Sequence, residues 1–206
     1  MTTVLCQTSD SYAFIADDYP VTNDMLRGFE HPIQCRSAAS FDKAWFVNDT
    51  ISQALVVELY TDYHRLQLIH FNARQIPNIV FRSLELHSKT DNETTYSLLD
   101  DKSKPDAVNC FLKVAKRLSP NYFKTNKGFS LGMSSKKAVK LYGTPSAMQE
   151  TNEGKLLSWD FVGDYMGYAN KDDLPANYAV DSFGYHIKVL FKNDKAVVII
   201  MENDAP

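Results

Sequence analysis

Long apolar runs are missing from this 206-residue sequence, which limits where the protein can work. The longest run, residues 196–201, is far shorter than the roughly 18 residues of a membrane-spanning helix. A basic excess is missing too, because 22 lysines and arginines stand against 25 acidic residues, giving a net charge of −3. We therefore expect no transmembrane segment and no nucleic-acid partner, since phosphate backbones are bound by clustered positive charge.

Motifs for catalysis and metal binding are missing as well. The sequence has no glycine-rich phosphate loop and no C-x-x-C or Cys/His zinc spacing. His64 and His70, on one strand, would lie about 20 Å apart, too far to share a metal ion, so we interpret both as surface or half-buried strand residues. Ser134 lacks the Gly-x-Ser-x-Gly elbow of a hydrolase. We expect no cofactor, no metal site and no catalytic residue, and the pattern favours a protein that is not an enzyme.

Cysteine is scarce, and Cys6, Cys35 and Cys110 allow two interpretations. The simpler one is three buried thiols. The other is a disulfide between Cys6 and Cys35, because both lie in the irregular residues 1–50, where a cross-link most reduces the freedom of the unfolded chain. Such a bridge would indicate folding in an oxidising compartment, with Cys110 unpaired in an apolar strand.

The sequence is nevertheless rich enough in apolar residues, at 44%, to bury a substantial core. That core can be one large domain or two small ones that share a sheet. We divide the chain into a β-rich half, residues 1–122, with an irregular start, and a second half, residues 123–206. The boundary is predicted within the polar stretch 119–127, which contains Pro120.

From residue 51 onward the pattern of the first half becomes strand-like. Residues 54–60 and 63–71 read as a hairpin, followed by strands at 78–87 and 94–99. Residues 108–114 extend this meander or form a helix, and 100–106 are predicted to be a loop. Residues 21–28 are predicted to form one or two helical turns.

The second half begins with a short helix. Ser134 is a good N-cap, Ala138, Val139 and Tyr142 form a buried stripe, and Gly143 followed by Pro145 ends the helix. Such a short helix is unstable alone and must pack on a sheet. That sheet is predicted from antiparallel strands at 157–161, 185–191 and 196–201, the last apolar on both faces and therefore central. The expected fold is α+β, with short helices packed on a predominantly antiparallel sheet.

These features resemble a known family. The resemblance lies in the order Gly132-Met-Ser134, Val139, Tyr142-Gly143-x-Pro145, a strand centred on Trp159, and the hairpin Phe191-Lys-Asn-Asp-Lys-Ala-Val197. This order resembles the repeat of the β-lactamase-inhibitor-protein-like domains, and is similar to the small lipoprotein of the bacterial outer-membrane assembly machine. The resemblance covers about residues 124–203. It implies a helix on an antiparallel sheet, export across the bacterial inner membrane, and protein binding without catalysis.

The connection between two of these strands, residues 163–183, is unusually long, and long connections are often functional. Its tyrosines and methionine offer large amphipathic contact area, so we predict partner-binding residues at Tyr165, Met166, Tyr168 and Tyr178. The alternative is that these side chains fold back over the sheet. The acidic residues of the loop lack the spacing of a calcium-binding loop.

Two functions from different classes follow. The leading one is a non-catalytic interaction module, periplasmic or secreted, that presents a sheet face and the 163–183 loop to a protein partner. The opposing one is a hydrolase or small-ligand-binding protein whose site lies between the two halves, and the alternative location is the cytoplasm. Residues 1–6 lack the basic and then apolar pattern of a leader peptide, so an exported chain is expected to carry its leader outside this sequence.

Overall fold

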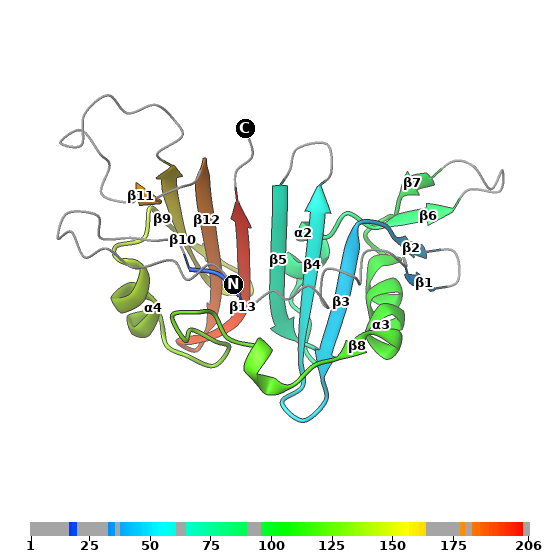
Figure 1. Ribbon diagram of the computed structural model, residues 1–206, viewed down its shortest axis with the longest axis horizontal. Helices are drawn as coiled ribbons and strands as arrows, with labels where there is room; N and C mark the ends of the chain where they lie inside the picture. Colours follow the sequence, from blue (N-terminus) through cyan, green and yellow to red (C-terminus); the bar gives the residue numbers. More distant parts are fainter. Residues whose placement is uncertain are drawn as a thin grey trace, which may run out of the picture.

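The computed structural model describes residues 17–19, 33–35, 38–60, 65–89, 96–163, 178–179 and 183–203. Within these residues the fold is α+β, as predicted (Figure 1). The helices are α2 (Asn78–Ser83), α3 (Lys104–Val114), α4 (Ser135–Tyr142) and the 3-10 helix η3 (Pro120–Tyr122). The strands are β1 (Ile33–Cys35), β2 (Ala38–Ser40), β3 (Lys43–Asn48), β4 (Gln53–Tyr60), β5 (Arg65–Asn72), β6 (His87–Lys89), β7 (Tyr96–Leu98), β8 (Lys116–Arg117), β9 (Ala147–Thr151), β10 (Gly154–Gly163), β11 (Tyr178–Ala179), β12 (Gly184–Lys192) and β13 (Lys195–Asn203).

One large sheet contains strands from both halves of the chain, in the order β11-β10-β12-β13-β5-β4-β3-β8, with β9 also paired to β10. Its neighbours are antiparallel except β10 with β11 and β3 with β8. The halves join where β13 pairs with β5, with Ile200 opposite Ile69. The predicted central position of residues 196–201 is confirmed. A separate small sheet has the order β1-β2-β6-β7.

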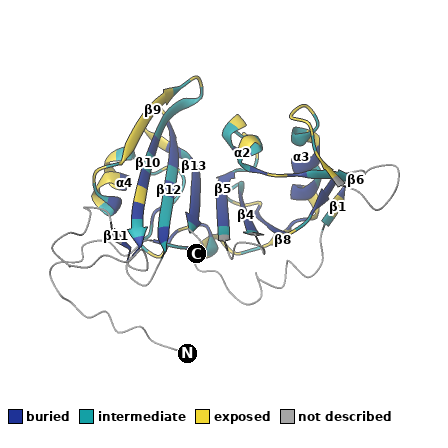
Figure 2. Cartoon of the chain, turned by 90° about the horizontal axis from the view of Figure 1, so that it is seen from above, coloured by how far each residue is buried: buried dark blue, intermediate teal, exposed yellow. Residues whose placement is uncertain are grey.

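Apolar side chains of the large sheet form one core on each face, because successive residues of a strand point to opposite sides. On one face, Trp159 and Phe46 pack with Tyr142 of α4 and Phe129. On the other face, Trp45 packs against Phe111 of α3, and α2 and the small sheet complete the cover. Figure 2 shows α4 on the opposite side of the sheet from α2 and α3. Among the described helices, none has the length and apolar character needed to cross a membrane.

Helix α4 begins and ends at the predicted residues. The Ser134 hydroxyl accepts a hydrogen bond from the Lys137 backbone N–H at 3.3 Å, which satisfies one amide of the first turn. Gly143 ends the helix with φ 82° and ψ −163°, a region open to glycine. Ala138 and Tyr142 are buried, but Val139 is 39% exposed, so its predicted place in the buried stripe is wrong.

Two predictions in the first half are corrected. Residues 78–87 do not form one strand: α2 occupies 78–83 and β6 starts at 87. The carboxylate of Glu153, in the turn between β9 and β10, accepts hydrogen bonds from the backbone N–H groups of Asn78 (2.8 Å) and Ile79 (3.3 Å). The start of this helix is thus held by a residue distant in sequence, so a local pattern could not reveal it. For residues 108–114 the helical alternative is confirmed, and α3 starts inside the predicted loop, with Pro105 in its first turn.

The disulfide prediction is also corrected. Cys35 is bonded to Cys110, with their Cα atoms 5.9 Å apart, and not to Cys6, which lies outside the described residues. Cys110 is in helix α3 rather than in an unpaired position on a strand. The two cysteines are 75 residues apart in the sequence, but α3 packs beside β1 and brings them together. Closeness along the sequence therefore did not predict which cysteines are close in space.

His70 is fully buried on β5, not at the surface or half-buried as the sequence suggested. Its Nδ1 lies 2.7 Å from the Tyr19 hydroxyl and its Nε2 lies 2.7 Å from Gln53 Oε1. Burial lowers the pKa of the imidazole to about 3. Nearby, the Tyr142 hydroxyl donates to Asp17 at 2.9 Å. These contacts fix residues 17–19 against the core that both halves share.

Candidate functional site

One face of β10 and β12 is more exposed than the rest of the large sheet. We call this surface the open face, defined by Leu156, Ser158, Asp160, Val162, His186 and Lys188. Asp160 is exposed and the other members are partly buried. On the opposite face of the same strands, Leu157, Trp159, Phe161, Ile187 and Val189 are all buried. Figure 2 shows this difference as mixed colours on β10 and β12 beside the dark blue of β4 and β5.

Strand β9 forms an exposed edge next to the open face. Four of its five residues are exposed, and Met148 is 62% exposed (Figure 2). The backbone of β10 already has partners along the edge that faces β9. Residues 154–158 pair with β9 and residues 162–163 pair with β11. Between them, the Asp160 N–H donates to Ser146 Oγ at 3.0 Å. No strand in the described part of the chain pairs with the outer side of β9. Outward-facing backbone groups of β9 can therefore pair with another strand.

A row of polar side chains crosses the sheet from the first half to the open face. We call it the polar row, and its members stand opposite one another in successive strand pairs: Lys43, Glu58, Gln67, Glu202, His186 and Asp160. Strand alternation puts all of them on the face that α2 and α3 cover elsewhere. Gln67 and Glu202 face each other where the two halves join.

The buried end of the polar row lies in the first half. Lys43 and Glu58 form an ion pair in which each side chain is 3% exposed, so each charge needs the other to offset its lost hydration. Gln67 and Glu202 are also buried. Gln67 Oε1 has no hydrogen-bond partner in the described part of the structure, and an unpaired buried acceptor is destabilising.

The exposed end of the polar row lies on the open face. His186 Nδ1 and Asp160 Oδ1 lie 2.8 Å apart, and their side chains are 31% and 50% exposed. An exposed pair of this kind contributes little to stability. Within the residues that the structure describes, no group of three or more His, Cys, Asp or Glu side chains is arranged to hold a metal ion.

The predicted partner-binding residues fall largely outside this description. Tyr165, Met166 and Tyr168 lie outside the described residues, so their role stays a prediction. Tyr178 is the first residue of β11, and its backbone pairs with Val162 on β10. Residues 178–179 therefore lie on the same side of β10 as β9.

Sequence reasoning missed the polar row because its members are spread from residue 43 to residue 202. A weak signal was present: Glu58 interrupts the apolar run of β4, and Glu202 ends the apolar run of β13. A buried strand carries such residues only where they find partners. Which partners they find depends on strand register, which local sequence does not fix.

No family model, curated protein or solved structure matches the chain. The resemblance of residues 124–203 to the β-lactamase-inhibitor-protein-like domains therefore rests on the sequence features alone, and it stays a prediction.

Proposed function

We propose that the protein is a non-catalytic binding module that holds an extended segment of a protein partner along β9 and over the open face. The observation that carries the proposal is the difference in burial within one sheet. The same face is buried on β3, β4 and β5, but on β10 it carries half-buried Leu156 and Val162 and exposed Asp160. A partner that covers these side chains would complete the burial found elsewhere in the sheet.

Strand addition is the binding mode that suits this edge. Main-chain hydrogen bonds to an edge strand supply affinity, and alternate side chains supply specificity. Met148 presents an exposed apolar side chain on β9, on the same face of the sheet as its opposite residue Leu157, whereas His186 and Asp160 present a polar pair on the open face. Edge strands of monomeric sheets are usually protected by bulges, prolines or dense charge. In β9, Glu150 is the single charged residue.

We also propose that the protein works in the periplasm or outside the cell. The Cys35–Cys110 disulfide supports this location, because disulfides persist in oxidising compartments and are rare in the cytosol.

Amide hydrogen exchange of the partner complex tests the proposed binding mode. The partner is first captured with the wild-type protein from an envelope extract of the cells that produce it, and is then purified. We expect slower exchange in residues 147–151 when the partner is bound, because outward amides of β9 become hydrogen-bonded. Slower exchange elsewhere, with β9 unchanged, contradicts strand addition.

A matched pair of variants complements this measurement. Met148→Lys places a charge on the β9 edge and is expected to weaken partner binding at least tenfold, since lysines protect edge strands from pairing. Leu98→Lys alters a residue of similar exposure on β7, 66% against 62%, and should bind as the wild type does. Equal affinity for the two variants in calorimetry contradicts the proposal.

The polar row favours a second candidate, a hydrolase or small-ligand-binding protein with its site between the two halves. Gln67 of the first half and Glu202 of the second meet there, and Gln67 carries the unpaired acceptor. Loss of partner binding in Gln67→Leu, with Met148→Lys unaffected, would move the function to this site.

A further inference from the structure

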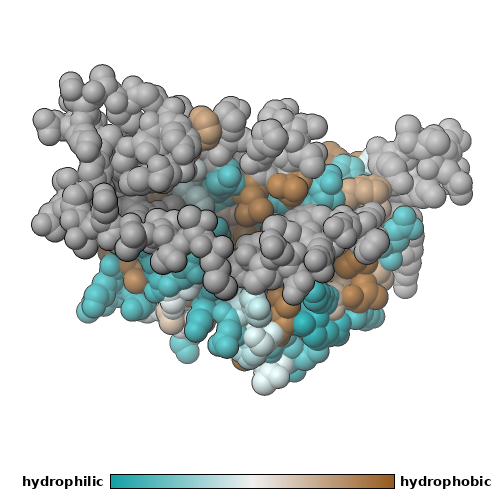
Figure 3. All heavy atoms as spheres, viewed as in Figure 1, coloured by the Kyte–Doolittle hydropathy of each residue, from teal (hydrophilic) through white to brown (hydrophobic). Residues whose placement is uncertain are grey.

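A cleft of about 640 Å³ lies in the first half, away from the open face. Its walls come from the turn between β3 and β4, the residues after β5, and helix α3. Its lining includes Val47, Asp49, Arg74, Leu112, Lys113 and Arg117. None of them belongs to the open face or the polar row. In the view of Figure 3, the lower edge of the molecule, where the β3–β4 turn lies, is mostly hydrophilic.

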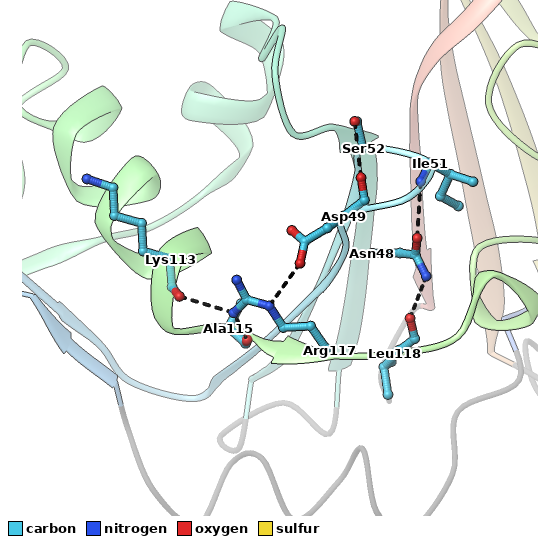
Figure 4. A network of polar contacts seen from close by, with 8 residues as sticks. All are labelled: Asn48, Asp49, Ile51, Ser52, Lys113, Ala115, Arg117 and Leu118. Atoms are coloured by element: carbon cyan, nitrogen blue, oxygen red, sulfur yellow. Dashed lines mark hydrogen bonds and ion pairs between the residues drawn. The ribbon is translucent and has the colours of Figure 1, made fainter.

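Arg117 is held in a fixed orientation at the cleft. Its Nη1 donates to the carbonyl oxygens of Lys113 (3.1 Å) and Ala115 (2.7 Å), and its Nε donates to Asp49 Oδ2 at 3.3 Å (Figure 4). Nη2 bonds to no residue in the described part of the chain. A guanidinium whose other donors are occupied loses little side-chain entropy when the remaining nitrogen binds a ligand.

The turn that carries Asp49 is itself anchored. Asn48 Nδ2 donates to the Leu118 carbonyl oxygen at 2.7 Å, and Asn48 Oδ1 accepts from the Ile51 N–H at 3.1 Å (Figure 4). The Arg117 guanidinium is therefore held by two carbonyl oxygens at the end of α3 and by Asp49, whose turn is itself fixed by hydrogen bonds. Preorganised donors of this kind are what anion recognition requires.

Positive charge predominates at the cleft. Arg74, Lys113 and Arg117 line it, against Asp49 and Asp106. The Arg74 side chain forms no hydrogen bond or ion pair with any described residue, so its charge is available. Figure 4 shows the Lys113 side chain directed along α3 and away from Arg117, so its ammonium is not a fixed part of the site.

We propose that this cleft binds a small organic carboxylate. The carboxylate would accept hydrogen bonds from Arg117 Nη2 and from Arg74, and the apolar body would lie against Val47 and Leu112. The volume lies within the range of roughly 300–1,000 Å³ typical of small-molecule sites. This site is additional to the proposed partner-binding surface and does not depend on it.

Fluorine NMR of the full chain with para-fluorobenzoate tests the proposal. We expect binding in the range of about 1 mM, as befits a small fragment. The neutral isostere para-fluorobenzamide has nearly the same shape without the charge, and should bind at least tenfold more weakly. Equal binding of the two compounds, or no binding of either, overturns the proposal.

Three substitutions locate the binding. Arg117→Gln and Arg74→Gln should each weaken para-fluorobenzoate binding at least fivefold. Arg82→Gln is the matched control, because Arg82 is an exposed residue of α2 outside the cleft. This variant should bind para-fluorobenzoate as the wild type does. Arg117 also hydrogen-bonds to the carbonyl oxygens of Lys113 and Ala115, so the Arg117→Gln variant can fold poorly. In that case the affinity of Arg74→Gln tests the location of the site. Unchanged affinity in Arg74→Gln, or an equal loss in Arg82→Gln, overturns the assignment.

Discussion

The two halves of the large sheet differ in how they are covered. In the first half, β3, β4 and β5 are buried on both faces, and every residue of β4 from Ala54 to Val57 is at most 1% exposed. In the second half, β10 is buried on the face toward α4 but half-exposed on the other. The local sequences record this difference: the run Ala54-Leu-Val-Val57 is apolar throughout, whereas Leu157-Ser-Trp-Asp-Phe161 alternates. Continuous apolar strands indicate two covers, and alternating strands indicate one.

The largest effect on this comparison is expected from the disulfide, which lies in the covered half. Cys35→Ala combined with Cys110→Ala should lower the free energy of unfolding by about 4 kcal/mol, because the link closes a long loop and restricts the unfolded chain. Urea unfolding measures this loss. Hydrogen exchange should show lost protection in α3 and little change in β10, because the bond anchors α3 to β1.

Thiol counting on the denatured protein provides the control. One free thiol without reductant and three with it are expected, and peptide mapping should place the free thiol at Cys6. Three free thiols in both samples contradict the disulfide and remove the support for an oxidising compartment.

Acid should destabilise the region where the two halves meet. His70 lies on β5 opposite Ile199 of β13, and burial lowers its pKa from 6.5 to about 3. Between these values the unfolded chain binds a proton that the folded chain does not, so the free energy of unfolding decreases as pH falls through this window. We expect a loss of about 3 kcal/mol at pH 4, measured by urea unfolding across pH. If the stabilities of the two halves depend on each other, the protection of their amides against hydrogen exchange should decline together as the pH falls.

A variant isolates this contribution. His70→Gln cannot be protonated, so its stability should fall less between pH 6.5 and pH 4 than that of the wild type. Burial raises the pKa of Asp18, whose protonation favours the folded state and offsets part of the acid loss in both proteins. An identical pH dependence in the variant and the wild type shows that His70 is not the cause.

The last prediction compares two truncations on the same face of the two halves, and the one on the open face is the smallest effect expected. Ile69→Ala, at a position with no exposed surface, should lower the free energy of unfolding by about 3 kcal/mol, because it leaves a cavity between two covers. Leu156→Ala, on the open face, should lower it by about 1 kcal/mol, since solvent already reaches this side chain. Equal losses in urea unfolding would show that the open face is as tightly covered as β5.

The sequence by itself determined the fold class and part of the local elements, but it left β1, β2 and β3 inside a stretch predicted to be irregular. Ser134 and Gly143 fixed the ends of α4, apolar runs marked β4 and β13, and alternation marked β10 and β12. Each of these depends on residues within a few positions of one another, where capping and side-chain period act.

Only the tertiary structure decided which distant residues meet. It paired Cys35 with Cys110, placed Glu153 at the start of α2, buried His70, and aligned Lys43 through Asp160 into one row. These arrangements depend on strand register and on how helices pack on the sheet, and both are set by burying the whole core at once. The candidate binding surfaces arise in the same way, because an edge or a cleft exists only after its walls have been brought together.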